Sequence, residues 1–275
     1  MKTLKVGGLV LLVVVFLGIV PVQTYNPLAH VYVAGRTSLF WWPKADLYYG
    51  AIAPDIAWYA ATPEVVAALA EMTHYTYFDL RRYASNPEQR AFARGLLTHN
   101  QLWGLDAYAH GRFGAYVTIR IEPLMTWAQG RGIPINEAMA EFAIETAIDL
   151  RLKQQQPLLP AVLLEAVLCR SWEDQELFGK AYPHNLWFAL YTTEPAFRNL
   201  TYRYATALAL QSPQDKEALA ALGVQLAKQM VSPGSPVPNK DQVSAVLTQA
   251  VSNCSDFMGP LQAAVLRISS RIGWF

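Results

Sequence analysis

The sequence predicts a mostly α-helical fold built as one large domain, and three observations support this prediction. Of the 275 residues, 53% are hydrophobic and only 16% are charged, against roughly 25% charged residues in an average soluble domain. A large buried core is therefore expected and disorder is excluded. Most of the chain after residue 60 carries apolar residues at helical spacing, punctuated by Pro, Ser, Asn and Gly. The one segment that alternates like a strand, 115–122, is enough for one arm of a small β-hairpin and too little for a sheet.

The first 24 residues differ from the rest of the chain. Lys2 and Lys5 precede an uncharged apolar stretch over 6–22, which is the arrangement of a secretory signal peptide. The stretch is slightly short for a comfortable membrane span of roughly 20 residues, so a cleavable signal peptide is favoured over an uncleaved N-terminal anchor. Both interpretations place the remaining residues outside the cytoplasm, in a secreted, periplasmic or membrane-anchored protein.

Helix signals mark most of the remaining chain. Thr62 and Pro63 suit the cap and first position of a helix over 62–82, and Asn86 and Pro87 start a second helix in the same way. Periodic apolar residues predict further helices over 134–153, 158–169, 194–211, 214–231, 240–252 and 258–271.

The best linker candidate is the run Ser-Pro-Gly-Ser-Pro-Val-Pro at 232–238. It divides the chain into a helical domain over 25–231 and a C-terminal helical extension over 232–275. The two cysteines, Cys169 and Cys254, are too few for a thiolate metal site. An exported compartment permits a disulfide between them, and the sequence leaves that pairing, like the oligomeric state, open. The net charge of +1 supplies no electrostatic footprint for duplex nucleic acid.

Four of the five histidines lie between positions 30 and 110. If the run 99–110 is helical, His99, Asp106 and His110 fall at i, i+7 and i+11 and share one face. Two imidazoles and a carboxylate are a sound ligand set for zinc. His30 and His74 stand in apolar surroundings, which by themselves favour a core histidine at each position.

Carboxylates also stand in apolar sequence. Glu141, Glu145 and Asp149 fall at i, i+4 and i+8 among Ala and Ile residues, so they lie on one helix face. Buried carboxylates need a partner or a metal, and like charges at this spacing repel. A solvated face paired with Lys or Arg is the alternative. Asp55 follows Pro54 in an apolar stretch, where a turn or a helix cap is the alternative.

The order of these residues resembles the zinc-dependent phospholipase C family, which includes bacterial phospholipases C and, more distantly, fungal single-strand nucleases. The ordered set is His30, Ala53-Pro54-Asp55, His74, the run from His99 through Asp106 to His110, and the acidic helix. The resemblance covers about residues 26–150 and no single piece of it is diagnostic. It implies a mostly α-helical domain that holds two or three zinc ions between its helices. It also implies hydrolysis of phosphate esters by a metal-activated water.

The resemblance assigns roles to individual residues. Asp55 takes the place of the aspartate that binds metal or serves as the base near the attacking water, and Asp106 that of a bridging carboxylate. Glu145 matches the late glutamate of the family, while Glu141 stands where the family has a ligand histidine. No Trp precedes His30 to match the family's N-terminal ligand. The metal ligands implied are His30, Asp55, His74, His99, Asp106, His110, Glu141 and Glu145.

The sequence therefore predicts an exported, zinc-dependent phosphoesterase that acts on a small-molecule or lipid phosphate ester, with a membrane surface as a further partner. Two alternatives remain open. One is a non-catalytic, metal-binding helical envelope protein. The other is a helical envelope protein whose histidines are core residues and which binds no metal.

Overall fold

The computed structural model describes residues 27–38, 44–75 and 79–272. The predicted signal peptide or anchor over 1–24 lies outside them. The described part of the chain is mostly helical and forms no strand. The α-helices are α1 (Pro27–Thr37), α2 (Lys44–Ile52), α3 (Pro63–Ala70), α4 (Pro87–His99), α5 (Asp106–Ala109), α6 (Thr118–Gln129), α7 (Glu137–Gln155), α8 (Leu159–Cys169), α9 (Glu173–Ala181), α10 (His184–Ala209), α11 (Gln214–Met230), α12 (Lys240–Asn253) and α13 (Met258–Ile272). Three short helices complete the set: η1 (Ala53–Tyr59) and η3 (Leu80–Arg82) are 3₁₀, and η2 (Glu71–Tyr75) is a π-helix.

The caps read from the sequence start the helices where they were expected. The side chains of Thr62 and Asn86 accept hydrogen bonds from the first turns of α3 and α4, which satisfies amide groups that the helix leaves without a partner. The helix predicted over 62–82 is shorter, because α3 passes at residue 71 into the π-helix η2. The helix predicted from 194 starts ten residues earlier, at His184, and runs through Pro195.

The strand predicted over 115–122 is wrong. Gly114 and Ala115 adopt positive φ angles of 115° and 47°, and the chain turns there into α6. From Val117 onward the buried residues follow helical spacing, with Ile121 and Leu124 on the same face. Packing of this face overrides the short alternating pattern.

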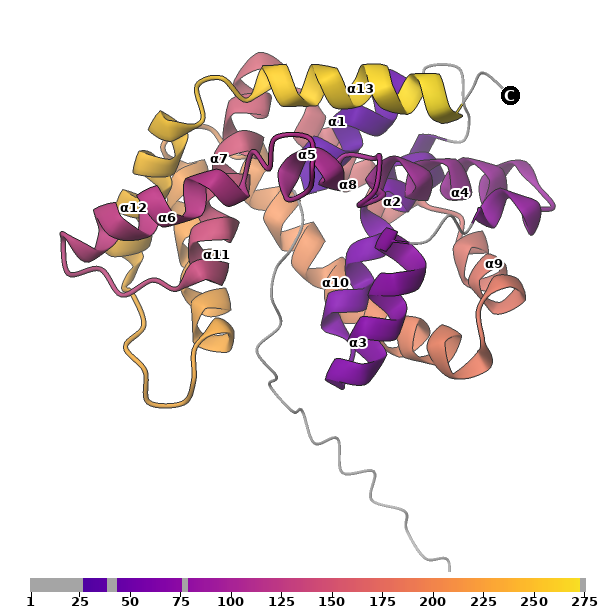
Figure 1. Ribbon diagram of the computed structural model, residues 1–275, viewed down its shortest axis with the longest axis horizontal. Helices are drawn as coiled ribbons and strands as arrows, with labels where there is room; N and C mark the ends of the chain where they lie inside the picture. The colour runs from indigo at the N-terminus through magenta and orange to yellow at the C-terminus, as the bar shows by residue number, and fades with distance from the viewer. Residues whose placement is uncertain (1–26, 39–43, 76–78, 273–275) are drawn as a thin grey trace, which may run out of the picture.

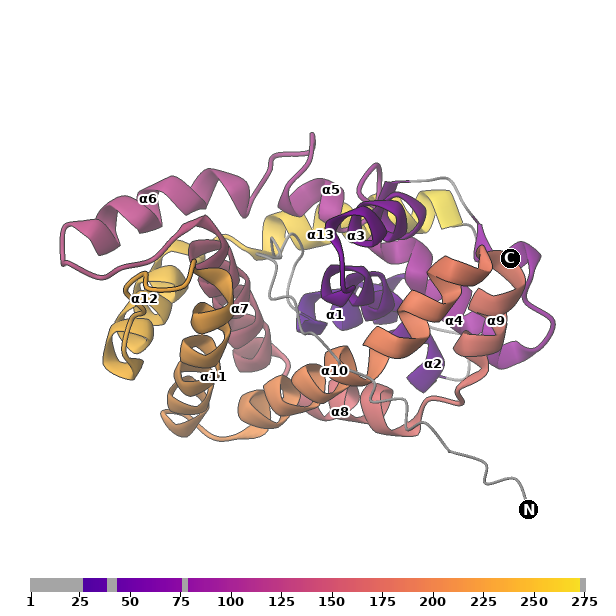
Figure 2. The same cartoon turned by 90° about the horizontal axis from the view of Figure 1, so that it is seen from below.

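Helix α7 lies at the centre of the fold and packs against α1, α6, α8, α11 and α12. Figures 1 and 2 show α6, α11 and α12 gathered at one end of the molecule, and α2, α4 and α9 toward the other. Almost every residue of α7 between Met139 and Leu152 is buried, because five other helices pack around it. Its carboxylates therefore have no access to a solvated face, which excludes that alternative for Glu141 and Glu145.

The helices that follow the 232–238 segment belong to the same hydrophobic core as the rest of the chain. Leu247 of α12 and Leu261 and Ile268 of α13 are fully buried members of it. Helix α12 packs on α7 and α11, and α13 packs on α1, α4 and α5. The two cysteines are free thiols, Cys169 exposed and Cys254 buried.

Helices α2 and α4 cross at backbone contact. A Cβ atom on Gly50 would lie 2.1 Å from the carbonyl oxygen of Phe92, and one on Gly95 would lie 2.0 Å from that of Leu47. Only glycine fits at such a distance. The crossing brings the C-terminal end of α4 beside the last turn of α2, and this sets the position of His99. In the described segments, no helix has the length and apolar character that crossing a bilayer requires.

Candidate metal centre

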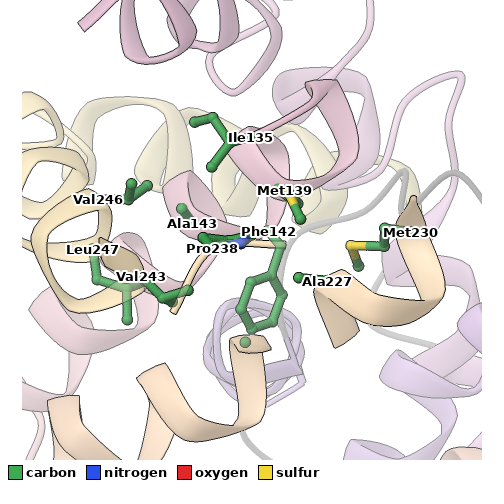
Figure 3. Close-up of a pocket in the computed structure, with 11 residues that line it drawn as sticks. Ile135, Met139, Phe142, Ala143, Ala227, Met230, Pro238, Val243, Val246 and Leu247 are labelled. Carbon is green, nitrogen blue, oxygen red and sulfur yellow. The ribbon is translucent and has the colours of Figure 1, made fainter. Parts of the chain in front are cut away.

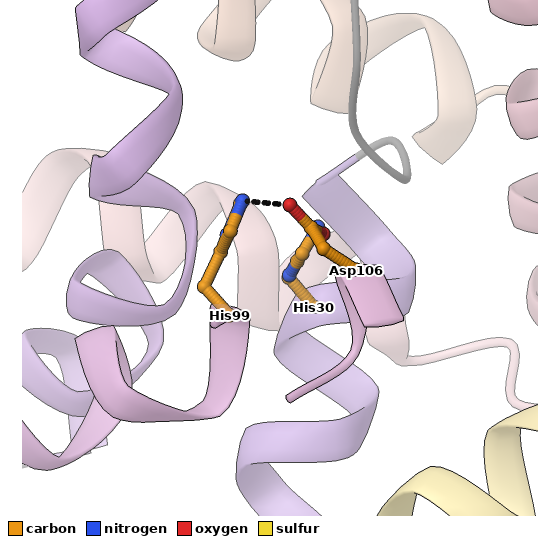
Figure 4. Close-up of side chains that lie close together, drawn as sticks. All are labelled: His30, His99 and Asp106. Atoms are coloured by element: carbon orange, nitrogen blue, oxygen red, sulfur yellow. Dashed lines mark ion pairs between the residues drawn. The ribbon is translucent and has the colours of Figure 1, made fainter. Parts of the chain in front are cut away.

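Five helical elements bring five of the predicted ligands together in the interior of the protein. His30 is in the second turn of α1, Asp55 in η1 and His74 in η2, while His99 ends α4 and Asp106 begins α5. All five residues are at most 6% exposed. Figure 4 shows His30, His99 and Asp106 converging from three separate segments.

The run from 99 to 110 is not one helix, so the prediction that His99, Asp106 and His110 share a helix face is wrong. His99 and Asp106 still meet, while His110 belongs to a separate group described below. The side-chain oxygen of Asn100 accepts hydrogen bonds from the amides of Leu102 and Trp103 at 2.8 and 3.2 Å, and this turn ends α4. A Cβ on Gly104 would lie 2.6 Å from the nitrogen of Asn100, so the turn depends on glycine. The chain then reverses and Asp106 faces back toward His99.

The ligand atoms of Asp55, His74, His99 and Asp106 form the first group and lie close to one another. Nε2 of His99 lies 3.0 Å from Oδ2 of Asp106 and 3.4 Å from Oδ1 of Asp55. Nε2 of His74 lies 3.6 Å from Oδ1 of Asp55 and 3.9 Å from Oδ2 of Asp106. Donor atoms around one tetrahedral zinc at about 2.0–2.2 Å are themselves about 3.3–3.6 Å apart. Two of the four observed separations fall within that range, and the other two, 3.0 and 3.9 Å, lie on either side of it.

The second oxygen of Asp106 faces a different partner. Its Oδ1 lies 3.6 Å from Nε2 of His30, whose ring stacks on that of His99 at 4.0 Å between centroids. His30, His99 and Asp106 form a second group of suitable donors. Asp106 therefore stands between two groups with one oxygen toward each, as a bridging carboxylate does.

A third group lies where α5 ends against α7. Nδ1 of His110 is 3.2 Å from Oε1 of Glu141, and Nε2 of His110 is 3.4 Å from Oε1 of Glu145. The two glutamates are one helical turn apart on α7, and Glu145 is fully buried. The structure thus brings all eight predicted residues together. Asp149, on the same face, contacts α1 instead.

Two of the histidines are held in one tautomer by groups behind them. Nδ1 of His99 lies 2.9 Å from the carbonyl oxygen of Ala51, which can only accept, so Nδ1 carries the proton. Nδ1 of His74 lies 2.7 Å from the hydroxyl of Thr73, which itself donates to the carbonyl of Leu69 at 2.8 Å. In both rings Nε2, on the side of the carboxylates, is therefore the nitrogen left to bind a metal, and such supporting bonds are typical of metal-binding histidines. Sequence analysis missed Thr73, because a threonine beside a histidine carries no distinctive signal.

The carboxylates of the centre have no Lys or Arg partner within the part of the chain that the structure describes. Among the described residues, no Lys or Arg forms an ion pair with Asp55, Asp106, Glu141 or Glu145, and both oxygens of Asp106 and of Glu145 accept no hydrogen bond. Elsewhere in the fold, Glu194 pairs with Arg170 at 2.7 Å. Burying an uncompensated charge is strongly unfavourable, so the centre requires protons or metal ions.

The ionisation equilibria reflect this crowding. Burial, with the nearby Glu137 and Asp106, raises the pKa of Glu141 to about 8. Burial and the charge of Glu141 also raise the pKa of Glu145. Burial opposes a charge on His99, but Asp106 and Asp55 outweigh it and raise its pKa to about 10. Without metal, the centre therefore holds protons that a metal ion would displace.

An apolar pocket lies on a different face of α7, against α11 and α12 (Figure 3). Its lining includes Met139, Phe142, Ala227 and Val243 and contains no titratable side chain. It offers no donor for a metal and no group for acid–base chemistry. The chemistry of the described residues is concentrated in the metal centre.

A scan against protein-family models, a search of the curated proteins and a search of the solved structures found no significant match to the chain.

Proposed function

We propose that this protein is an extracytoplasmic, zinc-dependent hydrolase of phosphate esters, of the phospholipase C type that its ordered ligands resemble. The observation that carries the proposal is the position of Asp106 between two groups of donors, beside a third group on α7. All donors are nitrogen or carboxylate oxygen, a set that suits zinc. Neighbouring ions bridged by a carboxylate are the arrangement of many phosphoester hydrolases.

The donors divide unequally among the ions. Asp55, His74 and His99 form a three-donor group, and Oδ2 of Asp106, 3.0 Å from Nε2 of His99, is placed to supply a fourth donor. His110, Glu141 and Glu145 supply three donors and leave one position open, the pattern of a catalytic zinc. His30 and the other oxygen of Asp106 provide only two donors not shared with the first site. This accounts for a centre of two or three ions.

Zinc in such a centre lowers the pKa of a bound water toward about 7 and neutralises the phosphoryl group. The residues of the chain orient these partners. Burial opposes ionisation of Asp55, but His99 outweighs it and lowers the pKa of Asp55. The carboxylate is therefore ionised at neutral pH, and it binds a metal or orients the attacking water by accepting its hydrogen bond.

Two partly exposed tyrosines lie near the carboxylates of the centre. Tyr59 and Tyr75 are 38% and 37% exposed, and the buried carboxylates affect the pKa of both hydroxyls. Burial and Asp55 raise the pKa of Tyr59, while burial and Asp106 raise that of Tyr75. Both hydroxyls therefore stay protonated at neutral pH and can donate hydrogen bonds to a substrate. An anionic ester group at the centre with a larger group against the two rings fits this surface.

The test combines metal analysis with turnover. The full-length protein, purified without added metal or chelator, is analysed for zinc and assayed on a phosphomonoester, a phosphodiester and phosphatidylcholine vesicles. The proposal expects two or more zinc ions per chain and hydrolysis of at least one substrate, with loss of both in His99→Ala. Asp55→Asn should reduce turnover at least a hundredfold.

Zero zinc, with none taken up on addition, would refute the metal centre. Stoichiometric zinc without turnover of any of the three substrates would instead favour the non-catalytic metal-binding alternative.

A further inference from the structure

Asp149 of α7 is a fully buried carboxylate that the metal centre does not use. Its Oδ1 accepts a hydrogen bond from the amide of Ala29 at 3.0 Å, and its Oδ2 accepts one from the amide of Leu28 at 3.1 Å. The hydroxyl of Tyr204 on α10 donates to the same Oδ2 at 3.1 Å. Three donors from two other helices therefore converge on one side chain.

The two amides belong to the first turn of α1, which begins at Pro27. Amide groups in a first turn have no partner within the helix, and a residue just before the helix usually supplies one. Helices α3, α4, α7 and α12 follow this rule, with caps at Thr62, Asn86, Asn136 and Asn239. In α1 the partner is a carboxylate about 120 residues away in the chain.

The next residue along α1 is His30. The start of α1 sets the height and rotation at which the His30 ring meets Oδ1 of Asp106, 3.6 Å away. Asp149 lies on the same face of α7 as Glu141 and Glu145, at i+8 and i+4 from them. One rigid helix therefore carries two ligands of one site and holds in place the helix that supplies the histidine of another.

His74 and His99 do not share this dependence. They are oriented by the hydroxyl of Thr73 and the carbonyl of Ala51, neither of which belongs to α1 or α7. A loss of Asp149 thus acts on one side of the centre, and this selectivity separates a positioning role from a general contribution to stability.

We propose that Asp149 is a positioning residue, which fixes the first turn of α1 so that His30 and Asp106 can hold an ion together. The inference rests on the proposed metal centre and adds Asp149 as the residue that sets the position of His30 relative to the other ligands. Supporting residues of this kind typically change metal affinity by about 10- to 100-fold. That change should fall on the ion bound by His30, and the site of His110, Glu141 and Glu145 should keep its affinity.

The experiment measures zinc and cobalt affinities of the intact protein by competition with a chromophoric chelator, and follows each site by the visible spectrum of cobalt. The variants are Asp149→Ala, Asp149→Asn and Tyr204→Phe, with His30→Ala as the reference for loss of one site. Asp215→Asn is the matched control, because Asp215 is a buried carboxylate that pairs with Lys153 at 2.6 Å on α7 and contacts none of the ligands.

We expect Asp149→Ala to weaken the same site as His30→Ala, by about 10- to 100-fold. Asp149→Asn keeps one carbonyl oxygen for one of the two amides and should fall between Asp149→Ala and the wild type. Tyr204→Phe leaves both amide bonds and should have a severalfold effect on the same site. If Asp149→Ala does not fold, as judged by circular dichroism, the Asn and Phe variants make the same comparison.

Unchanged affinities in folded Asp149 variants would overturn the inference. So would an equal fall at every site, or a fall of the same size in Asp215→Asn, because either result would mean a loss of general stability. A wild-type protein that takes up no metal would instead remove the proposed function itself, so the two failures are distinguishable.

Discussion

The zinc affinity of the site formed by His110, Glu141 and Glu145 should rise steeply with pH. Burial lowers the pKa of His110 to about 4, so at neutral pH this ring is already uncharged and able to bind. The two glutamates are not. The pKa of Glu141 is raised to about 8 and that of Glu145 is also raised, and a carboxyl group must lose its proton before it binds a metal.

The size of the effect follows from the number of protons displaced. Below the pKa of a ligand, each displaced proton increases the apparent affinity about tenfold per pH unit. One proton from Glu141 predicts about a tenfold gain between pH 6 and 7, and a second from Glu145 predicts about a hundredfold gain. The share of Glu141 should level off above its pKa of about 8. In Glu141→Gln one proton is absent and the repulsion on Glu145 is relieved, so the pH dependence should fall to about tenfold or less.

Competition with a chromophoric chelator at pH 6, 7 and 8 measures the affinities. Calorimetry in two buffers of different ionisation enthalpy counts the protons released. An affinity that changes less than about twofold between pH 6 and 7 would refute the assignment of displaceable protons to these glutamates. An unchanged pH dependence in Glu141→Gln would refute the share assigned to Glu141.

Three further predictions concern the fold. Without metal, a raised carboxyl pKa means that the folded protein binds a proton that the unfolded chain releases, so stability is lost as the pH rises through that pKa. Urea unfolding with chelator present should show that Glu141 costs on the order of 1–2 kcal/mol of the free energy of unfolding between pH 6.5 and 8. A rise in stability over this range would contradict the prediction. Gly95→Ala should destabilise the protein by about 3 kcal/mol or more, since its Cβ would meet a carbonyl oxygen at 2.0 Å, whereas Gly130→Ala, where the nearest atom is 3.6 Å away, should be nearly neutral in the same assay. A thiol reagent should modify Cys169, which is exposed, and leave the buried Cys254, whose pKa burial raises to about 11, until the protein unfolds; two rapidly reacting thiols would contradict the packing around Cys254.

The sequence predicted which residues form the centre better than it predicted the path between them. An unbroken helix was expected to place His99, Asp106 and His110 on one face. The protein instead brings His99 and Asp106 together through the turn at Asn100 and Gly104, and His110 faces Glu141 and Glu145. A prediction that depends on the type and order of the residues stays valid when the backbone between them takes a different path. The local conformation depends on one side-chain hydrogen bond that a helical pattern does not reveal.

Long-range contacts limited the prediction in a different way. Asp149 belonged to an acidic stripe whose three members looked equivalent in sequence, because helical spacing defines a shared face and no partner. The structure separates them: Glu141 and Glu145 face His110, while Asp149 reaches Leu28. The strand at 115–122 failed for the same reason, since burial of one face decided between two local patterns.

The arrangement of charges explains why a fold would keep so unfavourable a centre. Four buried carboxylates without a Lys or Arg partner among the described residues oppose folding unless protons or cations compensate them. Asp215 and Glu194, two buried acids elsewhere in the fold, are paired with Lys153 and Arg170, so the fold does provide cations for some of its buried carboxylates. Because the central helix α7 carries two of the uncompensated groups, any ion they hold stabilises the folded state over the unfolded chain. Metal uptake and completion of the fold are therefore expected to be coupled, because bound metal ions would supply the positive charge that the chain itself does not place beside these carboxylates.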